Sequence, residues 1–290
     1  MRRLFRSLVA RAAQIFWAAQ PMDLRERQSA LRAQIAQLKA EIAGSMPGNP
    51  VLDGFKVYSQ FDEDGIIETI LKRIAGACTF IEIGCGNGLE NNTHYLLLKG
   101  FSGVWIDGSK DNVEFIRRQL PSAFRPSSKL LVLEEMIDID NTVGTIEQAC
   151  LFIGTKEPDF FSIDIDGNDV FVLEKALSAC SPKVICVEYN SKFPPPMKLT
   201  IAYDPGHAWI NDDYAGASLQ KFCDMLGGYR LACCNLTGAN AFFVRDDLAS
   251  PFPSYPVEQL YQPPRYDLIY FTAGHRPSLN WLNNLLSGKN

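Results

Sequence analysis

Acidic side chains gather at two points in the second half of the chain. Asp164 and Asp166 follow an apolar run that ends at Ile163, and Glu188 ends a later apolar run, with Asn190 two residues beyond it. Residues two apart in an extended strand share one face. If the two runs are neighbouring parallel strands, their four oxygen-bearing side chains converge in one crevice at the carboxyl edge of the sheet.

Three interpretations of these acidic ends remain open. In the first, Asp164, Asp166, Glu188 and Asn190 hold Mg²⁺, which prefers oxygen ligands, and the metal orients an acceptor hydroxyl. In the second there is no metal, and Asp164 or Glu188 contacts the amine of a ligand or removes a proton from the acceptor. In the third, Asp166 or Asn168 only caps the helix that follows.

Two histidines are candidates for a catalytic base. His207 lies in the segment 203–209, whose mixture of polar and aromatic residues is typical of a loop that covers an acceptor. His94 falls on the first helix after a glycine-rich turn, where packing or capping accounts for it. The predicted catalytic residues are therefore Asp164, Glu188 and His207.

The glycine-rich turn at residues 84–88 indicates a nucleotide-type ligand. The run Glu82-x-Gly84-x-Gly86-x-Gly88 has glycines at alternate positions and an acid two residues before the first. Glycine lets the chain turn sharply and brings backbone amides close to a ligand. A dinucleotide-binding turn needs Gly-x-Gly-x-x-Gly, and Leu89 occupies its third glycine position. The pattern favours S-adenosylmethionine over NAD.

Two further acids extend this cofactor site. Asp107 ends the next apolar run, where a carboxylate can accept hydrogen bonds from both ribose hydroxyls. Glu135 lies in the turn after the third run, where an adenine would bind. The cofactor residues predicted from the sequence pattern are Glu82, Gly84, Gly86, Gly88, Asp107, Glu135 and Asp164.

Alternating helix and strand signals must position these residues. The expected strands cover residues 79–84, 103–107, 129–133, 158–164, 183–189, 229–235 and 239–245. Unbroken apolar runs among the first five are typical of a parallel sheet covered on both faces. The segment 236–238 is too short for a parallel crossover, so the last two strands form an antiparallel hairpin. The expected fold is a Rossmann-like α/β sheet of seven mostly parallel strands, the last antiparallel, as in class I methyltransferases.

Two N-terminal helices precede this domain. Residues 1–20 form a basic amphipathic helix, for which attachment to a membrane interface and docking on protein are both open. Residues 21–44 carry a heptad seam, which predicts a short coiled coil and a homo-oligomer; packing on the chain's own domain is the alternative. The seam consists of Leu24, Leu31, Ile35, Leu38 and Ile42.

The remaining boundaries follow from composition. Residues 45–57 are expected to be a linker, 58–249 the catalytic domain, and 250–290 a tail rich in Pro and aromatic residues with no clear element.

The chain has a net charge of −5, which argues against a nucleic-acid partner. Its eight cysteines show no paired zinc spacing, which is typical of a reducing compartment. We expect a cytoplasmic protein with peripheral contact to the inner membrane face through residues 1–20.

Several motifs together resemble FkbM-type methyltransferases. They are the run 58–67, the Glu82/Gly84 turn, the run 162–169 and Glu188-Tyr189-Asn190. The resemblance covers roughly residues 55–245. It implies an S-adenosylmethionine-dependent O-methyltransferase that acts on a hydroxyl of a glycan, glycolipid or natural-product intermediate.

The resemblance also assigns residues near the cofactor. It implies that Ser59, Gln60 and Asp64 help to close over it. Asp166 stands where the family's Asp-x-Glu-Gly run has Glu. The alternative from another class is a non-catalytic scaffold with a methyltransferase fold, assembled through its coiled coil.

Overall fold

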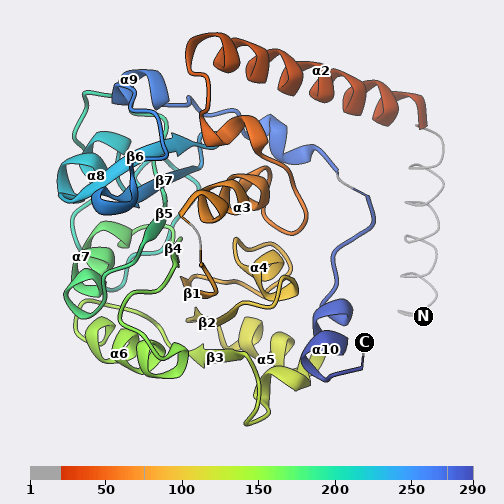
Figure 1. Cartoon of the computed structure of the whole chain (residues 1–290), viewed down its shortest axis with the longest axis vertical. Coiled ribbons are helices and arrows are strands. Elements are labelled where there is room, and N and C mark those ends of the chain that lie inside the picture. Colours follow the sequence, from red (N-terminus) through yellow and green to blue (C-terminus); the bar gives the residue numbers. More distant parts are fainter. Residues whose placement is uncertain (1–20, 75, 273, 290) are drawn as a thin grey trace.

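One sheet of seven strands forms the centre of the computed structural model, which describes residues 21–74, 76–272 and 274–289 (Figure 1). The strands are β1 (Thr79–Ile83), β2 (Ser102–Asp107), β3 (Leu130–Glu134), β4 (Phe160–Ile163), β5 (Val184–Glu188), β6 (Tyr229–Cys234) and β7 (Asn240–Arg245). Their order is β3-β2-β1-β4-β5-β7-β6. The first five are parallel, and β7 pairs antiparallel with both β5 and β6. The predicted fold class is confirmed.

Helices cover both faces of the sheet, which is why every residue of β1 and β4 is buried. One face carries α3 (Glu63–Ile74), α4 (His94–Leu98) and α5 (Lys110–Gln119), and the other carries α6 (Thr142–Ile153), α7 (Asp169–Ala179) and α8 (Leu219–Met225) (Figure 1). Short 3-10 turns, η1 (Pro50–Asp53), η2 (Pro121–Phe124) and η3 (Asp246–Leu248), lie between these elements. The core is therefore continuous on both sides of the strands.

The long helix α2 (Pro21–Ser45) corrects the coiled-coil prediction. Its residues Leu31 and Ile42 are buried in the main core, and Ile35 and Leu38 pack against that core. Four of the five seam residues are therefore packed within the chain, which is the alternative that the sequence left open, whereas Leu24 is exposed. The predicted helix 1–20 lies outside the described residues. Among the helices of the described part, none is long and apolar enough to cross a membrane.

The tail beyond residue 250 is ordered and packed, although its sequence predicted no element. It contains α9 (Val257–Leu260), η4 (Tyr266–Tyr270) and α10 (Asn280–Leu286). Four of its leucines are buried in the core cluster: Leu260, Leu268, Leu279 and Leu282. Figure 1 shows the tail running from the β6–β7 end of the sheet to α10 beside α5. It thus joins opposite ends of the domain.

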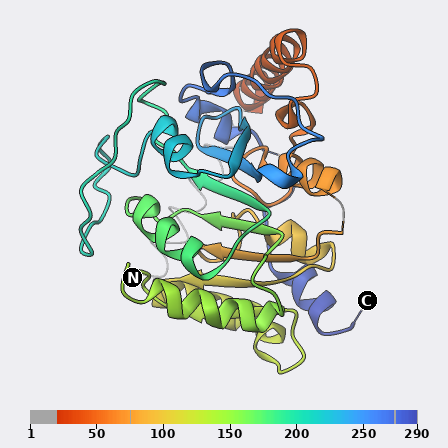
Figure 2. The same cartoon turned by 60° about the vertical axis from the view of Figure 1, so that its left-hand side comes forward.

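A long excursion between β5 and α8, residues 191–217, is here called the arm (Figure 2). Two of its segments pair as a short ribbon, with Ile201 N donating to Gly216 O over 3.2 Å and Ser218 N donating to Leu199 O over 2.9 Å. Because the arm leaves the carboxyl end of β5, it starts at the edge where ligands bind in this architecture.

Candidate active site

The glycine turn after β1 is shaped by left-handed backbone and by close neighbours. Gly84 has a φ of 82°, and a Cβ there would lie 1.7 Å from the carbonyl oxygen of Asp164. A Cβ on Gly86, in contrast, would meet no atom within 4 Å. The turn is therefore tightly packed beneath and open above Gly86, as a cradle for a cofactor requires.

Asp107 ties this turn to the end of β2. Its Oδ2 accepts a hydrogen bond from Gly86 N over 2.7 Å. Its Oδ1 accepts from Ser109 N over 2.9 Å and from Asn112 Nδ2 over 3.0 Å. A carboxylate oxygen can accept two hydrogen bonds, so Oδ2 keeps one position for a ribose hydroxyl. The structure thus brings the predicted residues Gly86 and Asp107 together.

Glu82 lies beneath the cradle, where its carboxylate is engaged by the chain. It accepts from Asn91 Nδ2 over 2.6 Å, from Asn92 N over 2.8 Å and from the Thr93 hydroxyl. Burial raises the pKa of Glu82 to about 7. The predicted cofactor contact is therefore corrected to a positioning role. The polar run 91–93 separates the glycine turn from α4, which begins at His94.

The segment 57–64 is folded around Asp64. The Oδ2 of Asp64 accepts backbone hydrogen bonds from Val57, Tyr58 and Ser59 at 2.6, 2.7 and 2.8 Å. The Ser59 hydroxyl donates to the same oxygen and accepts from Asp64 N. Ser59 is fully buried, so the predicted contact of Ser59 with the cofactor is replaced by a structural role. Gln60 is partly exposed and stays a candidate.

An aromatic contact joins this segment to the glycine turn. His94 Nδ1 lies 2.7 Å from Gly88 O, and the imidazole stacks on Tyr58. Burial lowers the pKa of His94 to about 4, so the ring is neutral near pH 7. Nδ1 then donates to the carbonyl, and His94 braces the turn. Sequence reasoning missed Tyr58 as part of this brace.

The turn after β3 contains the predicted adenine contact. Glu135 N donates to Asp107 O over 3.0 Å, and Asn141 Nδ2 donates to Glu135 Oε1 over 2.8 Å. The neighbouring Met136 is 71% exposed and packs over Gly108. Glu135 thus lies beside Asp107 as predicted, and Met136 adds an apolar surface there that the sequence pattern did not single out.

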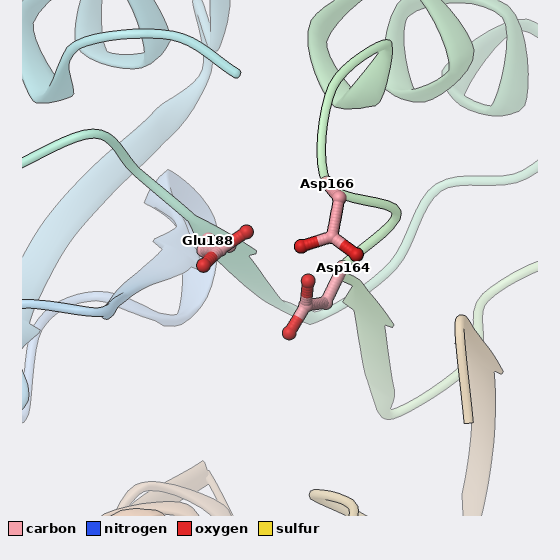
Figure 3. A group of neighbouring side chains, drawn as sticks. All are labelled: Asp164, Asp166 and Glu188. Atoms are coloured by element: carbon pink, nitrogen blue, oxygen red, sulfur yellow. The ribbon is translucent and has the colours of Figure 1, made fainter. Parts of the chain in front are cut away.

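Three carboxyl groups meet across the ends of β4 and β5 (Figure 3). One ligand oxygen from each of Asp164, Asp166 and Glu188 lies within 4.8 Å of the other two. Because Asp164 and Glu188 lie close together, ionising both would place two negative charges side by side. Burial against the strand ends, with the nearby carboxylate of Asp169, raises the pKa of Asp164 to about 7, although one side of Asp164 is open to solvent. Burial and Asp164 raise the pKa of Glu188 well above its usual range.

Asp169, at the start of α7, shapes the loop that carries two of these acids. Its carboxylate accepts from Ile165 N and Gly167 N, each over 2.9 Å. Between them Asp166 adopts a φ of 59°, which few residues other than Gly, Asn and Asp tolerate. Asn168 occupies the N-cap position of α7 without a capping hydrogen bond from its side chain, and Asp169, in the first helical turn, binds the preceding loop. The sequence signal that could have revealed this role of Asp169 is an acidic residue in the first turn of the helix.

The arm lies over this loop. Gly167 faces the His207 ring so closely that a Cβ there would lie 2.3 Å from His207 Cδ2. The Nε2 of His207 is buried without a partner among the described residues. Asn168 Nδ2 donates to Asp204 O over 2.8 Å. The structure thus places His207 next to the acidic loop.

Asn190, predicted as a fourth metal ligand, is engaged by the arm instead. Its Nδ2 donates to the carbonyl oxygens of Asp213 and Ala215, each over 3.0 Å, and its Oδ1 accepts from Lys192 N. We therefore remove Asn190 from the candidate metal ligands. Asp164, Asp166 and Glu188 remain.

Comparison with known families gives a match to one domain. Residues 67–206 match the model described as the methyltransferase FkbM domain. The matched segment begins within α3 and ends in the arm, so it contains the glycine turn, Asp107 and the three carboxyl groups. No curated protein matches the chain.

Three solved structures with similar folds are distant in sequence. An O-methyltransferase from Bacillus cereus in complex with SAH is 16% identical, with a TM-score of 0.39 over 75% of this chain and 91% of the other. Magnesium protoporphyrin IX methyltransferase from Synechocystis PCC 6803 with bound SAM is 12% identical, with a TM-score of 0.37 over 71% and 94%. CalS10, an amino pentose methyltransferase from Micromonospora echinaspora, is 13% identical, with a TM-score of 0.39 over 66% and 92%.

Proposed function

We propose that this chain, an S-adenosylmethionine-dependent methyltransferase with an FkbM domain at residues 67–206, transfers the methyl group to a hydroxyl of a glycan, glycolipid or natural-product intermediate. The observation that carries the proposal is the cluster of Asp164, Asp166 and Glu188 within 4.8 Å at the carboxyl ends of adjacent strands. It stands one strand away from the glycine cradle, because β4 pairs directly with β1.

The chain's residues fit S-adenosylmethionine at the cradle. The open face of Gly86 and the free acceptor position of Asp107 suit the ribose, and Met136 and Glu135 suit the adenine. Asp164 also suits the methionine amine, because its backbone packs under Gly84. The cofactor supplies an electrophilic methyl carbon, so the protein has only to align the acceptor and remove its proton.

The carboxyl pair provides the proton acceptor in this proposal. The acceptor oxygen bonds to the methyl carbon as the carbon–sulfur bond breaks, and the hydroxyl proton passes to the Asp164–Glu188 pair. A raised carboxyl pKa makes a stronger base near neutral pH. His207, held over Gly167, is placed to contact the acceptor from the arm side.

A cation is the second candidate for this cluster, and the mutual approach of three acids favours it. Mg²⁺ would be held by Asp164, Asp166 and Glu188 and would orient the hydroxyl. Titration calorimetry with Mg²⁺ in the presence of S-adenosylhomocysteine distinguishes the two modes. A metal-dependent enzyme loses Mg²⁺ binding and activity in Asp166→Asn, whereas the proton-accepting pair tolerates that change.

Methyl transfer is tested with radiolabelled S-adenosylmethionine and a panel of glycosides, glycolipids and phenols. Glu188→Gln should slow transfer about 10²- to 10⁴-fold, the usual contribution of a general base, while S-adenosylhomocysteine still binds. A non-catalytic scaffold would transfer no methyl group to any acceptor and would respond to none of these changes. Failure of wild-type protein to bind S-adenosylhomocysteine would overturn the proposal.

The basic segment 1–20 supports a peripheral membrane contact, which would bring the enzyme to lipid-linked acceptors. Arg2, Arg3 and Arg6 are three of its four basic residues. Cosedimentation of the whole chain with anionic vesicles tests this, and a variant with these three residues changed to Glu should remain in the supernatant. Equal sedimentation of both proteins would contradict the membrane contact.

A further inference from the structure

A second pocket lies inside the arm, beyond the carboxyl end of β5. It has a volume of about 170 Å³. Most of its lining is apolar, and the side chains that matter for the argument are Phe193, Leu199, Ile201, Tyr214, Ala215 and Ala217. The mechanism proposed above assigns no role to this pocket.

The pocket is built into the fold rather than left by a loose loop. The ribbon of the arm forms one wall, through the paired segments 199–201 and 216–218. Asn190 clamps another wall by donating to the carbonyl oxygens of Asp213 and Ala215. Tyr214 is held by its hydroxyl, which accepts from Ala202 N over 3.0 Å. These hydrogen bonds fix the walls before any ligand arrives.

The pocket lies close to the reactive carboxyl pair along the chain, although neither Asp164 nor Glu188 lines it. The chain stays extended past Glu188, since Tyr189 N donates to Ala239 O over 2.9 Å and Asn190 N donates to Ala217 O over 2.8 Å. Asn190 lines the pocket and lies two residues beyond Glu188. Two strand residues span about 7 Å and share a face. A group in the pocket would therefore lie about one ring length from a hydroxyl at Glu188.

The size and lining of the pocket indicate what it takes. A cavity of about 150 Å³ lined by Leu, Ile and Phe stays dry and binds benzene. The pocket in the arm is of similar size and mostly apolar, but it is open to solvent on one side and its lining includes polar residues, namely Asn190, Thr200, Asp213 and Ser218. An aromatic ring or a branched alkyl group fits the apolar part of the pocket, where a sugar hydroxyl would lack a partner.

We infer that the pocket formed by Phe193, Leu199, Ile201, Tyr214 and Ala215 binds an apolar ring or branched alkyl group of the acceptor, next to the hydroxyl that Glu188 receives. The inference rests on the proposed hydroxyl methylation and narrows its substrate class. The acceptor is amphiphilic, such as an aryl or prenyl glycoside, and not a plain glycan.

Phenyl β-D-glucopyranoside and methyl β-D-glucopyranoside are suitable probes, because they share the sugar and differ in the apolar group. Saturation-transfer NMR is recorded with the whole chain, with and without S-adenosylhomocysteine. We expect the phenyl compound to bind about tenfold or more tightly than the methyl compound, since burying a ring removes apolar surface from water. The ring protons should receive the strongest saturation.

Filling the pocket provides the matched comparison. Ala215→Leu should weaken binding of the phenyl compound about tenfold and leave the methyl compound unchanged. Ala36→Leu is the same change on an exposed position of α2, away from the arm, and it should behave as wild type. If Ala215→Leu disturbs folding, Ala215→Val adds less volume and should give a smaller loss in the same direction.

Equal binding of the two probes, absence of binding by both, or an unchanged affinity in both Ala215 variants would overturn the inference. Calorimetry with S-adenosylhomocysteine on the same samples measures cofactor binding and so tests the proposed function separately. Loss of phenyl binding with intact binding of S-adenosylhomocysteine rejects only the pocket. Phenyl binding without any binding of S-adenosylhomocysteine rejects the methyltransferase proposal and leaves the pocket standing.

Discussion

The ring of Tyr58 lies flat on the imidazole of His94, with centroids 3.6 Å apart and planes 13° apart. Through this stack the segment 57–64, which precedes the sheet, supports the glycine turn, because His94 also contacts Gly88 O over 2.7 Å. The other side of the same turn is supported by the tail, whose Leu279 would lie 3.6 Å from a Cβ on Gly88. Segments from both ends of the chain thus hold the cofactor cradle.

Loss of the stack should loosen the cradle. Tyr58→Ala removes the ring, and aromatic pairs of this kind contribute about 0.5–1.5 kcal/mol. We therefore expect S-adenosylhomocysteine to bind about three- to tenfold more weakly by calorimetry. Tyr58→Phe keeps the ring and gives up only a 3.4 Å hydrogen bond to Ser278 O, so its affinity should match wild type. Equal affinities for Tyr58→Ala and Tyr58→Phe would show that the stack has no part in cofactor binding.

Asp107 should be the strongest single determinant of cofactor affinity. In Asp107→Asn one oxygen becomes an NH₂ group, which cannot accept from Gly86 N or from Ser109 N and Asn112. Losing hydrogen bonds to a charged group costs about 1.5–3 kcal/mol, so affinity for S-adenosylhomocysteine should fall about tenfold or more. Asp111→Asn, an exposed change on α5, serves as the control. A variant at Asp107 that binds as tightly as the Asp111 variant would contradict this assignment.

The number and direction of the strands could be predicted from the sequence because each rests on local patterns. Apolar runs marked β1, β2, β4 and β5 to within two residues, and the short link at 236–238 required the hairpin that places β7 beside β5. The acidic strand ends could be predicted to converge for the same reason, since parallel neighbours end at one edge. These conclusions depend on period and loop length, which a sequence displays directly.

What the sequence could not reveal depends on partners far along the chain. The seam of α2 looks identical whether a second copy or the chain's own core covers it, and only the structure shows Leu31 and Ile42 in that core. Glu82 looked like a cofactor ligand because its partners, at 91–93, lie in a turn with no regular pattern. The tail has no periodicity, yet its leucines pack one by one against distant elements.

Glu82 predicts a distinct dependence of stability on pH. Its pKa is about 7 in the folded chain and about 4.5 when unfolded, so the folded state favours the protonated acid. Its stabilising contribution is complete below pH 4.5 and is lost as the pH rises through 7. Between pH 5 and pH 8 it should account for a fall of about 2 kcal/mol in the free energy of unfolding.

Urea unfolding across this pH range measures the effect of Glu82. Glu82→Gln cannot titrate, so its free energy of unfolding should fall less between the two pH values than that of wild type. The two proteins are compared by how steeply the free energy of unfolding changes with pH. The absolute values are not compared, because the amide in Glu82→Gln also loses an acceptor for Asn91, Asn92 or Thr93 at every pH. Glu174→Gln, an exposed change on α7, should keep the wild-type slope. A Glu82→Gln curve parallel to wild type would refute the pKa assignment.

Gly167 determines where the arm presents His207. A methyl group at this position would stand 2.3 Å from Cδ2 and 2.9 Å from Nε2 of the imidazole, so Gly167→Ala must displace the ring from the acidic loop. If His207 contacts the acceptor, methyl transfer should fall by the same factor in Gly167→Ala, His207→Ala and the double variant, because each removes the same contact. Binding of S-adenosylhomocysteine should change little. Gly144→Ala on α6 has open space at its Cβ and should keep full activity and gain slight stability from better helix propensity. Activity losses that multiply in the double variant would mean that Gly167 and His207 act independently, and His207 would then lose its place beside Asp164 and Glu188.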